Sequence, residues 1–102
     1  MAYIKNLAKF GFNTHRRTYV IAEIGINHDG NYDNALRLID SAARTGCDAV
    51  KFQTYRTESR APDGNQDVFD TLKRLELPLE AFGKLKNHCS ETGMDFFSTP
   101  FD

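Results

Sequence analysis

The chain has 102 residues, with 13 Lys and Arg against 14 Asp and Glu and a formal net charge of -1 at pH 7. This balance excludes the basic surface that is typical of proteins binding nucleic acid or anionic membranes. The length allows one domain and falls short of the roughly 250 residues of a closed eight-stranded α/β barrel. No segment approaches the ~18 apolar residues of a membrane-spanning helix, and the opening MAYIKNLAKF lacks the apolar core of a signal peptide.

The first elements in chain order are a lead-in, a strand and a helix. Residues 1–18 contain the turn-like stretch FGFNTHRRT, so we expect a short hairpin or extended lead-in. Residues 20–27 (VIAEIGIN) are rich in β-branched side chains, which predicts a first strand. Residues 31–44 carry apolar side chains at helical spacing, with Asn31 as N-cap residue and Gly46 as the stop.

A second cycle of strand and helix follows, and a third strand ends it. Residues 49–55 (AVKFQTY) predict the second strand, and the polar segment after them contains Pro and Gly, which predicts a long and functional loop. Helices are expected over 67–75 and 78–92, and a third strand over 94–99. Strands that alternate with helices predict an α/β fold with a parallel sheet, because a parallel return needs a crossover connection.

The three predicted strands each have an apolar and a more polar face, because successive side chains point to opposite sides. The apolar face carries Val20, Ala22, Ile24, Ile26, Val50, Phe52, Met94 and Phe96. The other face carries Ile21, Glu23, Gly25, Asn27, Ala49, Lys51, Gln53, Asp95, Phe97 and Thr99. Parallel sheets are covered on both faces, so we expect the polar face to line a barrel interior or a cleft. A structural ion pair between Glu23 and Lys51 is the main alternative, and such a pair could also hold a ligand.

Other polar residues give weaker signals. His28 follows the first predicted strand, and both a structural hydrogen-bonding role and a metal-ligand role stay open for it. One His beside one Asp is too few ligands for a complete metal site. The Gly-x-Gly-x-x-Gly motif of dinucleotide sites and the phosphate-binding P-loop motif are both absent. Cys47 and Cys89 have neither CxxC nor metal-site spacing, so we expect reduced thiols in a cytoplasmic protein.

Three segments between residues 19 and 102 occur in a familiar order: YVIAEIGINHDG, DAVKFQTY and LELPLEAFGKLKNHCSETGMDFFSTPFD. Together they resemble the N-terminal third of the sialic acid synthase family, the N-acetylneuraminate synthases and their legionaminic, pseudaminic and spore-coat relatives. The resemblance implies that residues 19–102 form the first three strands of a (β/α)8 TIM barrel. Two positions depart from the usual family text: Asp29, where Asn is common, and Pro78, where Ser or a similar cap is common.

The resemblance implies an enzyme that condenses phosphoenolpyruvate with an N-acetylmannosamine-type sugar to give a nine-carbon acid and phosphate. C3 of phosphoenolpyruvate attacks the sugar aldehyde, water adds at C2, and the tetrahedral intermediate expels phosphate by C–O cleavage. A divalent metal, manganese or magnesium, is implied to polarise the aldehyde, with ligands outside this chain. The resemblance also implies that the full-length enzyme is a homodimer.

Matching positions imply roles for seven residues of this chain. Glu23 matches a catalytic carboxylate that contacts the acceptor sugar, and Lys51 matches a catalytic lysine near the reacting groups. Five others match substrate-binding positions: Gln53 and Asn65 for the sugar, Thr99 for the phosphate, and Asn27 and His28 in support.

The sequence stops directly after the third predicted strand, whereas the resemblance places metal-binding histidines and a C-terminal antifreeze-like domain further along. We therefore expect that these 102 residues are part of a longer enzyme, and that they are inactive alone. Two alternatives stay open, namely a non-catalytic βαβαβ binding module and a different phosphoenolpyruvate-using aldolase-like barrel. The acceptor sugar depends on residues largely outside this chain, so N-acetylneuraminic, legionaminic and pseudaminic products are not distinguished.

Overall fold

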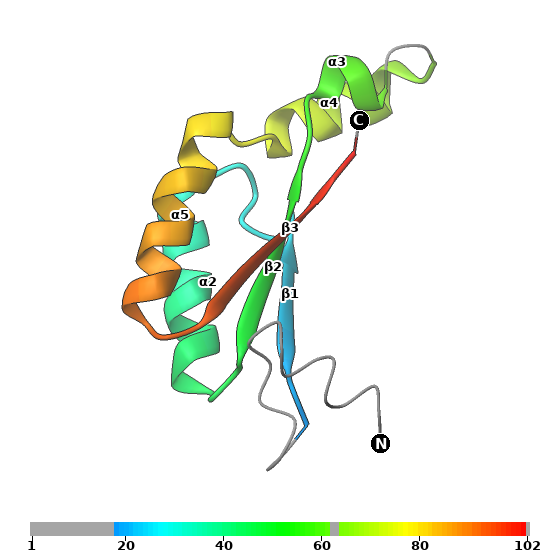
Figure 1. The fold of residues 1–102 in the computed structure, drawn as a ribbon. Helices are drawn as coiled ribbons and strands as arrows, with labels where there is room; N and C mark the ends of the chain where they lie inside the picture. Colours follow the sequence, from blue (N-terminus) through cyan, green and yellow to red (C-terminus); the bar gives the residue numbers. More distant parts are fainter. Residues whose placement is uncertain (1–17, 62–63, 102) are drawn as a thin grey trace.

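A three-stranded parallel sheet forms the centre of the computed structural model, which describes residues 18–61 and 64–101 (Figure 1). The strands are β1 (Ile21–Gly25), β2 (Ala49–Thr54) and β3 (Asp95–Pro100). They lie in the order β1-β2-β3, and both neighbouring pairs are parallel. The expected α/β class and the strand order of a partial barrel are confirmed. The lead-in expected over residues 1–18 lies, apart from its last residue, outside the described part of the chain.

Helix α2 (Tyr32–Arg44) returns the chain from β1 to β2 and begins where the sequence predicts. The Asn31 side chain accepts a hydrogen bond of 2.9 Å from the Asn34 amide, which satisfies one of the free donors of the first turn. Its apolar face is buried through Ala35, Ile39 and Ala42. Helix α2 is therefore capped at its start and held by burial of one face.

Helix α5 (Leu79–Glu91) lies on the same side of the sheet as α2 (Figure 1) and buries Ala81, Leu85 and Cys89. A hydrogen bond also joins the two helices, with 2.7 Å between His88 Nε2 of α5 and Asp40 Oδ1 of α2. The core between these helices and the sheet contains the apolar strand residues Ile24, Val50, Phe52 and Met94, with Ala22 and Phe96 packed against it. These are side chains of the predicted apolar face, so the assignment of faces is correct for β2 and β3 and for the centre of β1.

The long polar loop after β2 contains a short helix that the sequence pattern did not reveal, α3 (Thr57–Arg60), before α4 (Gln66–Leu75). The side chain of Arg56, the N-cap residue of α3, makes no hydrogen bond to the first turn of this helix. The Glu76 carboxylate, just after α4, accepts from the Thr57 amide at 2.7 Å and from Thr57 Oγ1 at 2.9 Å. A carboxylate distant in sequence thus caps α3, which is why a local pattern does not predict it.

The loop between β1 and α2 packs closely on the end of α4. Gly30 has φ +71, and a Cβ atom added there would lie 2.1 Å from the Arg74 carbonyl oxygen. Arg74 also pairs through its side chain with Asp29, at 2.6 Å between Nη1 and Oδ1. Both side chains are well exposed, so this pair stabilises by at most about 1 kcal/mol. The close approach of Gly30 to the backbone is the stronger constraint on the loop.

Gly30→Ala should destabilise the protein by about 3 kcal/mol or more, since a left-handed φ costs about 1–2 kcal/mol and overpacking adds about 1–3 kcal/mol. Gly46→Ala is the matched control, because Gly46 has φ +84 but an added Cβ would meet nothing within 4 Å. Urea unfolding followed by circular dichroism measures both. Equal losses for the two variants would show that contact with Arg74 is not the constraint.

Glu76→Ala should free the start of α3, with a loss of about 1–3 kcal/mol for the charge-assisted bonds to Thr57. Glu76→Gln keeps an acceptor oxygen and should lose less. Hydrogen exchange of the Thr57 amide is the local measurement, and it should accelerate most in Glu76→Ala. Unchanged protection of that amide in Glu76→Ala would contradict the capping role.

Candidate functional site

Four of the seven expected site residues share the sheet face that α2 and α5 leave uncovered. Glu23 on β1 lies opposite Lys51 on β2, and Gln53 on β2 lies opposite Thr99 on β3. Gln53 and Thr99 stand nearer the carboxyl ends of their strands than Lys51 does. Carboxyl ends of parallel strands are where α/β proteins place ligands, so this face is the candidate site.

The two charged residues of this face form an ion pair. Lys51 Nζ donates to Glu23 Oε2 at 2.9 Å, and the side chains are 34% and 51% exposed respectively. An ion pair at this exposure contributes about 0.2–1 kcal/mol, because water screens the charges. The structural ion pair considered above is therefore present, and it is weak enough for either group to turn toward a ligand.

Gly25 keeps space open between the polar side chains of this face, a role that the sequence pattern did not reveal. A Cβ atom added there would lie 3.1 Å from Glu23 Oε1 and 3.2 Å from Gln53 Nε2. Its φ of +57 also ends β1, and the register of β1 against β2 shifts between Glu23 and Gly25. In the sequence, a glycine at a polar-face position of a predicted strand is the feature that could have indicated this role.

Arg60 is a second site residue that sequence reasoning missed. It is the last residue of α3, and its Nη1 donates to Gln53 Oε1 at 3.4 Å. Its Cζ atom lies over the rings of Tyr55 and Phe101, 4.8 and 4.2 Å from their centroids. The unpredicted helix thus brings a cation to the carboxyl end of the polar face.

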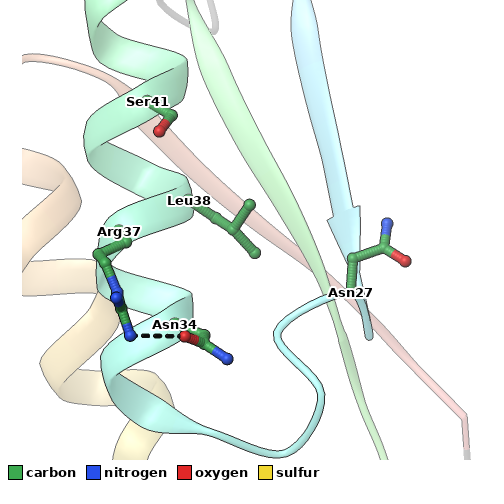
Figure 2. A pocket seen from close by; sticks show the side chains of 5 residues that line it. All are labelled: Asn27, Asn34, Arg37, Leu38 and Ser41. Atoms are coloured by element: carbon green, nitrogen blue, oxygen red, sulfur yellow. Dashed lines mark hydrogen bonds between the residues drawn. The ribbon is translucent and has the colours of Figure 1, made fainter.

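Alternation along β1 does not place Asn27, which lies beyond the end of the strand. The strand ends at Gly25, so the alternation of faces stops two residues before Asn27. Asn27 instead lines a pocket of about 250 Å³ with residues of α2 (Figure 2), namely Asn34, Arg37, Leu38 and Ser41. In Figure 2 Asn27 lies just beyond the end of the β1 arrow, and Arg37 donates to Asn34.

His28 lies inside the core, away from the polar face. Its side chain is 1% exposed and stacks on Phe52 with ring centroids 6.2 Å apart. Nδ1 accepts from the Gly30 amide at 3.0 Å, which assigns the proton of the neutral ring to Nε2. Burial lowers the pKa of His28, and the nearby Asp29 charge opposes this shift. Of the two roles left open for His28, the structure supports the structural hydrogen bond.

Asn65 is exposed and serves as the N-cap of α4. Its Oδ1 accepts from the Asp67 amide at 2.8 Å and from the Val68 amide at 3.4 Å. Because the cap uses the oxygen, a contact with a sugar would have to come from the Nδ2 amide. The structure therefore gives Asn65 a local role and does not bring it into the group around Lys51.

No three or more His, Cys, Asp and Glu side chains within residues 18–61 and 64–101 gather in a group that could hold a metal ion. These residues therefore do not fit the implied divalent cation as a complete site. No helix in the same ranges is long and apolar enough to cross a membrane.

Comparison with known proteins decides the family. The NeuB family model matches residues 38–102. The chain belongs to the NeuB family. The N-acetylneuraminic acid (sialic acid) synthetase of Leptospira borgpetersenii serovar Hardjo-bovis, solved in complex with citrate, is 38% identical, with a TM-score of 0.79 over 85% of this chain and 30% of that chain. The expected membership of the sialic acid synthase family is thus confirmed.

Two further relatives agree with this assignment. The spore coat polysaccharide biosynthesis protein SpsE of Bacillus subtilis is 39% identical, with a TM-score of 0.65 over 86% of this chain and 25% of that chain. The N,N'-diacetyllegionaminic acid synthase of Campylobacter jejuni is 34% identical over 100 residues, which cover 85% of this chain and 30% of the relative. This NeuB-family chain therefore spans less than a third of the length of these relatives.

The pH dependence of stability tests the buried position of His28. Its pKa is lower in the folded state than the ordinary value of 6.5. The contribution of neutral His28 to the free energy of unfolding is therefore complete above pH 6.5. It is lost as the pH falls from there through the pKa of the folded state. Urea midpoints between pH 8 and pH 5 should fall more steeply for the parent than for His28→Gln. The parent and the His28→Gln variant should both carry His88→Gln, because this substitution removes the second histidine contact, that of His88 with Asp40. Parallel curves would contradict burial of the neutral ring.

Proposed function

We propose that this chain supplies one wall of the active site of a phosphoenolpyruvate-dependent nonulosonic acid synthase. The observation that carries the proposal is the open sheet face on which Glu23, Lys51, Gln53 and Thr99 stand together. Family membership supports the reaction class, because relatives with assigned activities are synthases of sialic and legionaminic acids. The substrates are phosphoenolpyruvate and an N-acetylmannosamine-type sugar, and the products are a nine-carbon acid and phosphate.

Lys51 is proposed to bind an anionic group of phosphoenolpyruvate next to the reacting carbon. Its ammonium group now donates to Glu23, in a pair that costs about 1 kcal/mol or less to separate. A phosphate or carboxylate can therefore replace the Glu23 carboxylate as its partner. In a site closed to water, a lysine charge of this kind stabilises the negative charge that develops during condensation.

Glu23, Gln53 and Thr99 are proposed to orient the substrates. Glu23 would accept from a hydroxyl of the acceptor sugar and assist proton transfer once Lys51 turns to the anion. Gln53 would bind a sugar hydroxyl, and Thr99, which lies opposite Gln53 on β3, would donate its hydroxyl to the phosphate. Holding both substrates in one orientation converts the encounter into an effectively intramolecular reaction.

The described face is one wall of the proposed site, and the chain alone is proposed to be inactive. Within the described residues β3 pairs only with β2, and the metal-binding group is absent. The divalent cation of the reaction is proposed to be held by residues other than these, in a homodimeric full-length enzyme. We place that enzyme in the cytosol, in keeping with the free thiols of Cys47 and Cys89. Condensation product from the purified 102-residue chain would contradict the inactivity.

A graft tests the proposal. Residues 19–101 would replace the equivalent segment of the Leptospira synthetase, and phosphate release from phosphoenolpyruvate would be followed with mannosamine, bacillosamine-derived and altrose-type acceptors. We expect Lys51→Ala and Glu23→Gln each to lower kcat/KM by about 100-fold or more, and Gln53→Ala to act mainly by raising KM.

Lys84→Ala is the matched control, because Lys84 is exposed on α5, the helix behind the sheet. It should leave kcat/KM unchanged. Unchanged rates in both Lys51→Ala and Glu23→Gln would remove their proposed roles. A folded but inactive graft, with the parent synthetase active, would count against the function of the whole face.

A further inference from the structure

The guanidinium of Arg60 carries a charge that the proposed chemistry does not yet use. In the described part of the chain no carboxylate lies within ion-pair distance of Arg60. The residue is half-buried, so its charge is partly shielded from water. A cation in such a position is stabilised when an anion binds next to it.

The neighbours of Arg60 within residues 18–61 and 64–101 leave most of its hydrogen-bonding capacity unused. The rings of Tyr55 and Phe101 attract the cation through their faces. Unlike a carboxylate, the ring faces do not provide oxygen atoms that accept hydrogen bonds from the guanidinium. Among the described residues its guanidinium makes one hydrogen bond, of 3.4 Å to Gln53, which is longer than the usual range. Arginine has five N–H donors in a planar fork that matches two oxygens of a phosphate or carboxylate.

Arg60 is also held in place by contacts that no substrate supplies. The short helix that ends with Arg60 is capped by Glu76 through two bonds to Thr57. Tyr55 is 3% exposed, and its hydroxyl donates to the Leu72 carbonyl at 2.7 Å, so the ring beneath the guanidinium is fixed. A side chain held in this way loses little conformational freedom when a ligand binds.

Arg60 extends the row of ligand-binding groups toward the rim of the sheet. Gln53 lies two residues beyond Lys51 on the same face, about 6.6 Å further along the strand. Arg60 donates to the Oε1 atom of this amide from the helix that follows β2, so the face carries one cation at Lys51 and a second next to Gln53. The arrangement suits either two anionic substrates or one substrate with an anionic group at each end.

We propose that Arg60 is an anion-binding residue at the rim of the site, where it receives a phosphate or carboxylate group of a substrate. The inference rests on the proposed synthase function and adds a residue to it. Two substrates carry the required chemistry, phosphoenolpyruvate and an acceptor sugar bearing a phosphate ester. The position of Arg60 outward of Lys51 favours a group remote from the reacting carbon.

Binding to the intact 102-residue chain tests Arg60 without turnover. Arginine Nε–Hε signals would be followed by NMR at constant ionic strength, with phosphoenolpyruvate, a hexosamine 6-phosphate, an N-acetylhexosamine and inorganic phosphate as separate probes. The Arg60 signal should shift and saturate with at least one of the two organic phosphates and not with the neutral sugar. Arg60→Gln should weaken that binding about tenfold, and Arg60→Lys should restore it only in part.

Arg56→Gln is the matched control, since Arg56 precedes the same short helix, is exposed and makes no side-chain cap. It should change the affinity less than twofold. Preference for phosphoenolpyruvate or for the sugar phosphate identifies the source of the anion, and either result supports the inference. No saturable shift at Arg60, equal affinity for inorganic phosphate, or an equal loss in Arg56→Gln would overturn it.

The graft separates this inference from the proposed function. There Arg60→Gln should raise KM for the anionic substrate about tenfold while kcat stays within twofold. If the unmutated graft folded but released no phosphate while Arg60 of the 102-residue chain still bound the anion, the synthase proposal would fail and the anion site would stand. If Lys51→Ala abolished turnover while KM in Arg60→Gln stayed unchanged, the inference about Arg60 would fail alone.

Discussion

Burial of Phe52 in the middle of the central strand is the constraint on which both faces of the sheet depend. Phe52 is fully buried and contacts rings from three other segments: His28 after β1, Phe82 of α5 and Phe96 of β3. Fixing this side chain inward forces Lys51 and Gln53, its neighbours along the strand, to the opposite face. A slip of one residue would bury a lysine, so the packing of one ring also determines where the charged residues lie.

The end of α4 acts as a second organising point, this time for the loops at the carboxyl end of the sheet. The Arg74 carbonyl meets Gly30 of the loop after β1, the Leu72 carbonyl accepts from Tyr55 after β2, and Glu76 caps α3. None of these contacts uses a large apolar surface, and α4 itself buries no residue fully. Backbone carbonyls and one carboxylate therefore position the rim, whereas apolar packing positions the strands.

This division explains how much could be predicted from the sequence. Alternation along β2 and β3 follows directly from the chain, and so do the N-cap at Asn31 and the grouping of Lys51, Gln53 and Thr99. Alternation does not reach Asn27, because it ends where Gly25 adopts a positive φ, which a repeating pattern does not show. Helix α3 and Arg60 were missed because their partners, Glu76 and Phe101, are distant along the chain and invisible to any local pattern.

The charges of the open face are arranged so that a ligand can rearrange them at small cost. Glu23 satisfies Lys51 in an exposed pair, and Gln53 satisfies Arg60 through one long hydrogen bond. Each contact contributes about 1 kcal/mol or less, because the Lys51–Glu23 pair is exposed and the Arg60–Gln53 bond is long. An anion can therefore replace Glu23 at Lys51, or Gln53 at Arg60, at small cost to the protein. In the proposed reaction, release of Lys51 would also leave the Glu23 carboxylate available to a sugar hydroxyl, so that binding of the anion prepares the group proposed to receive the second substrate.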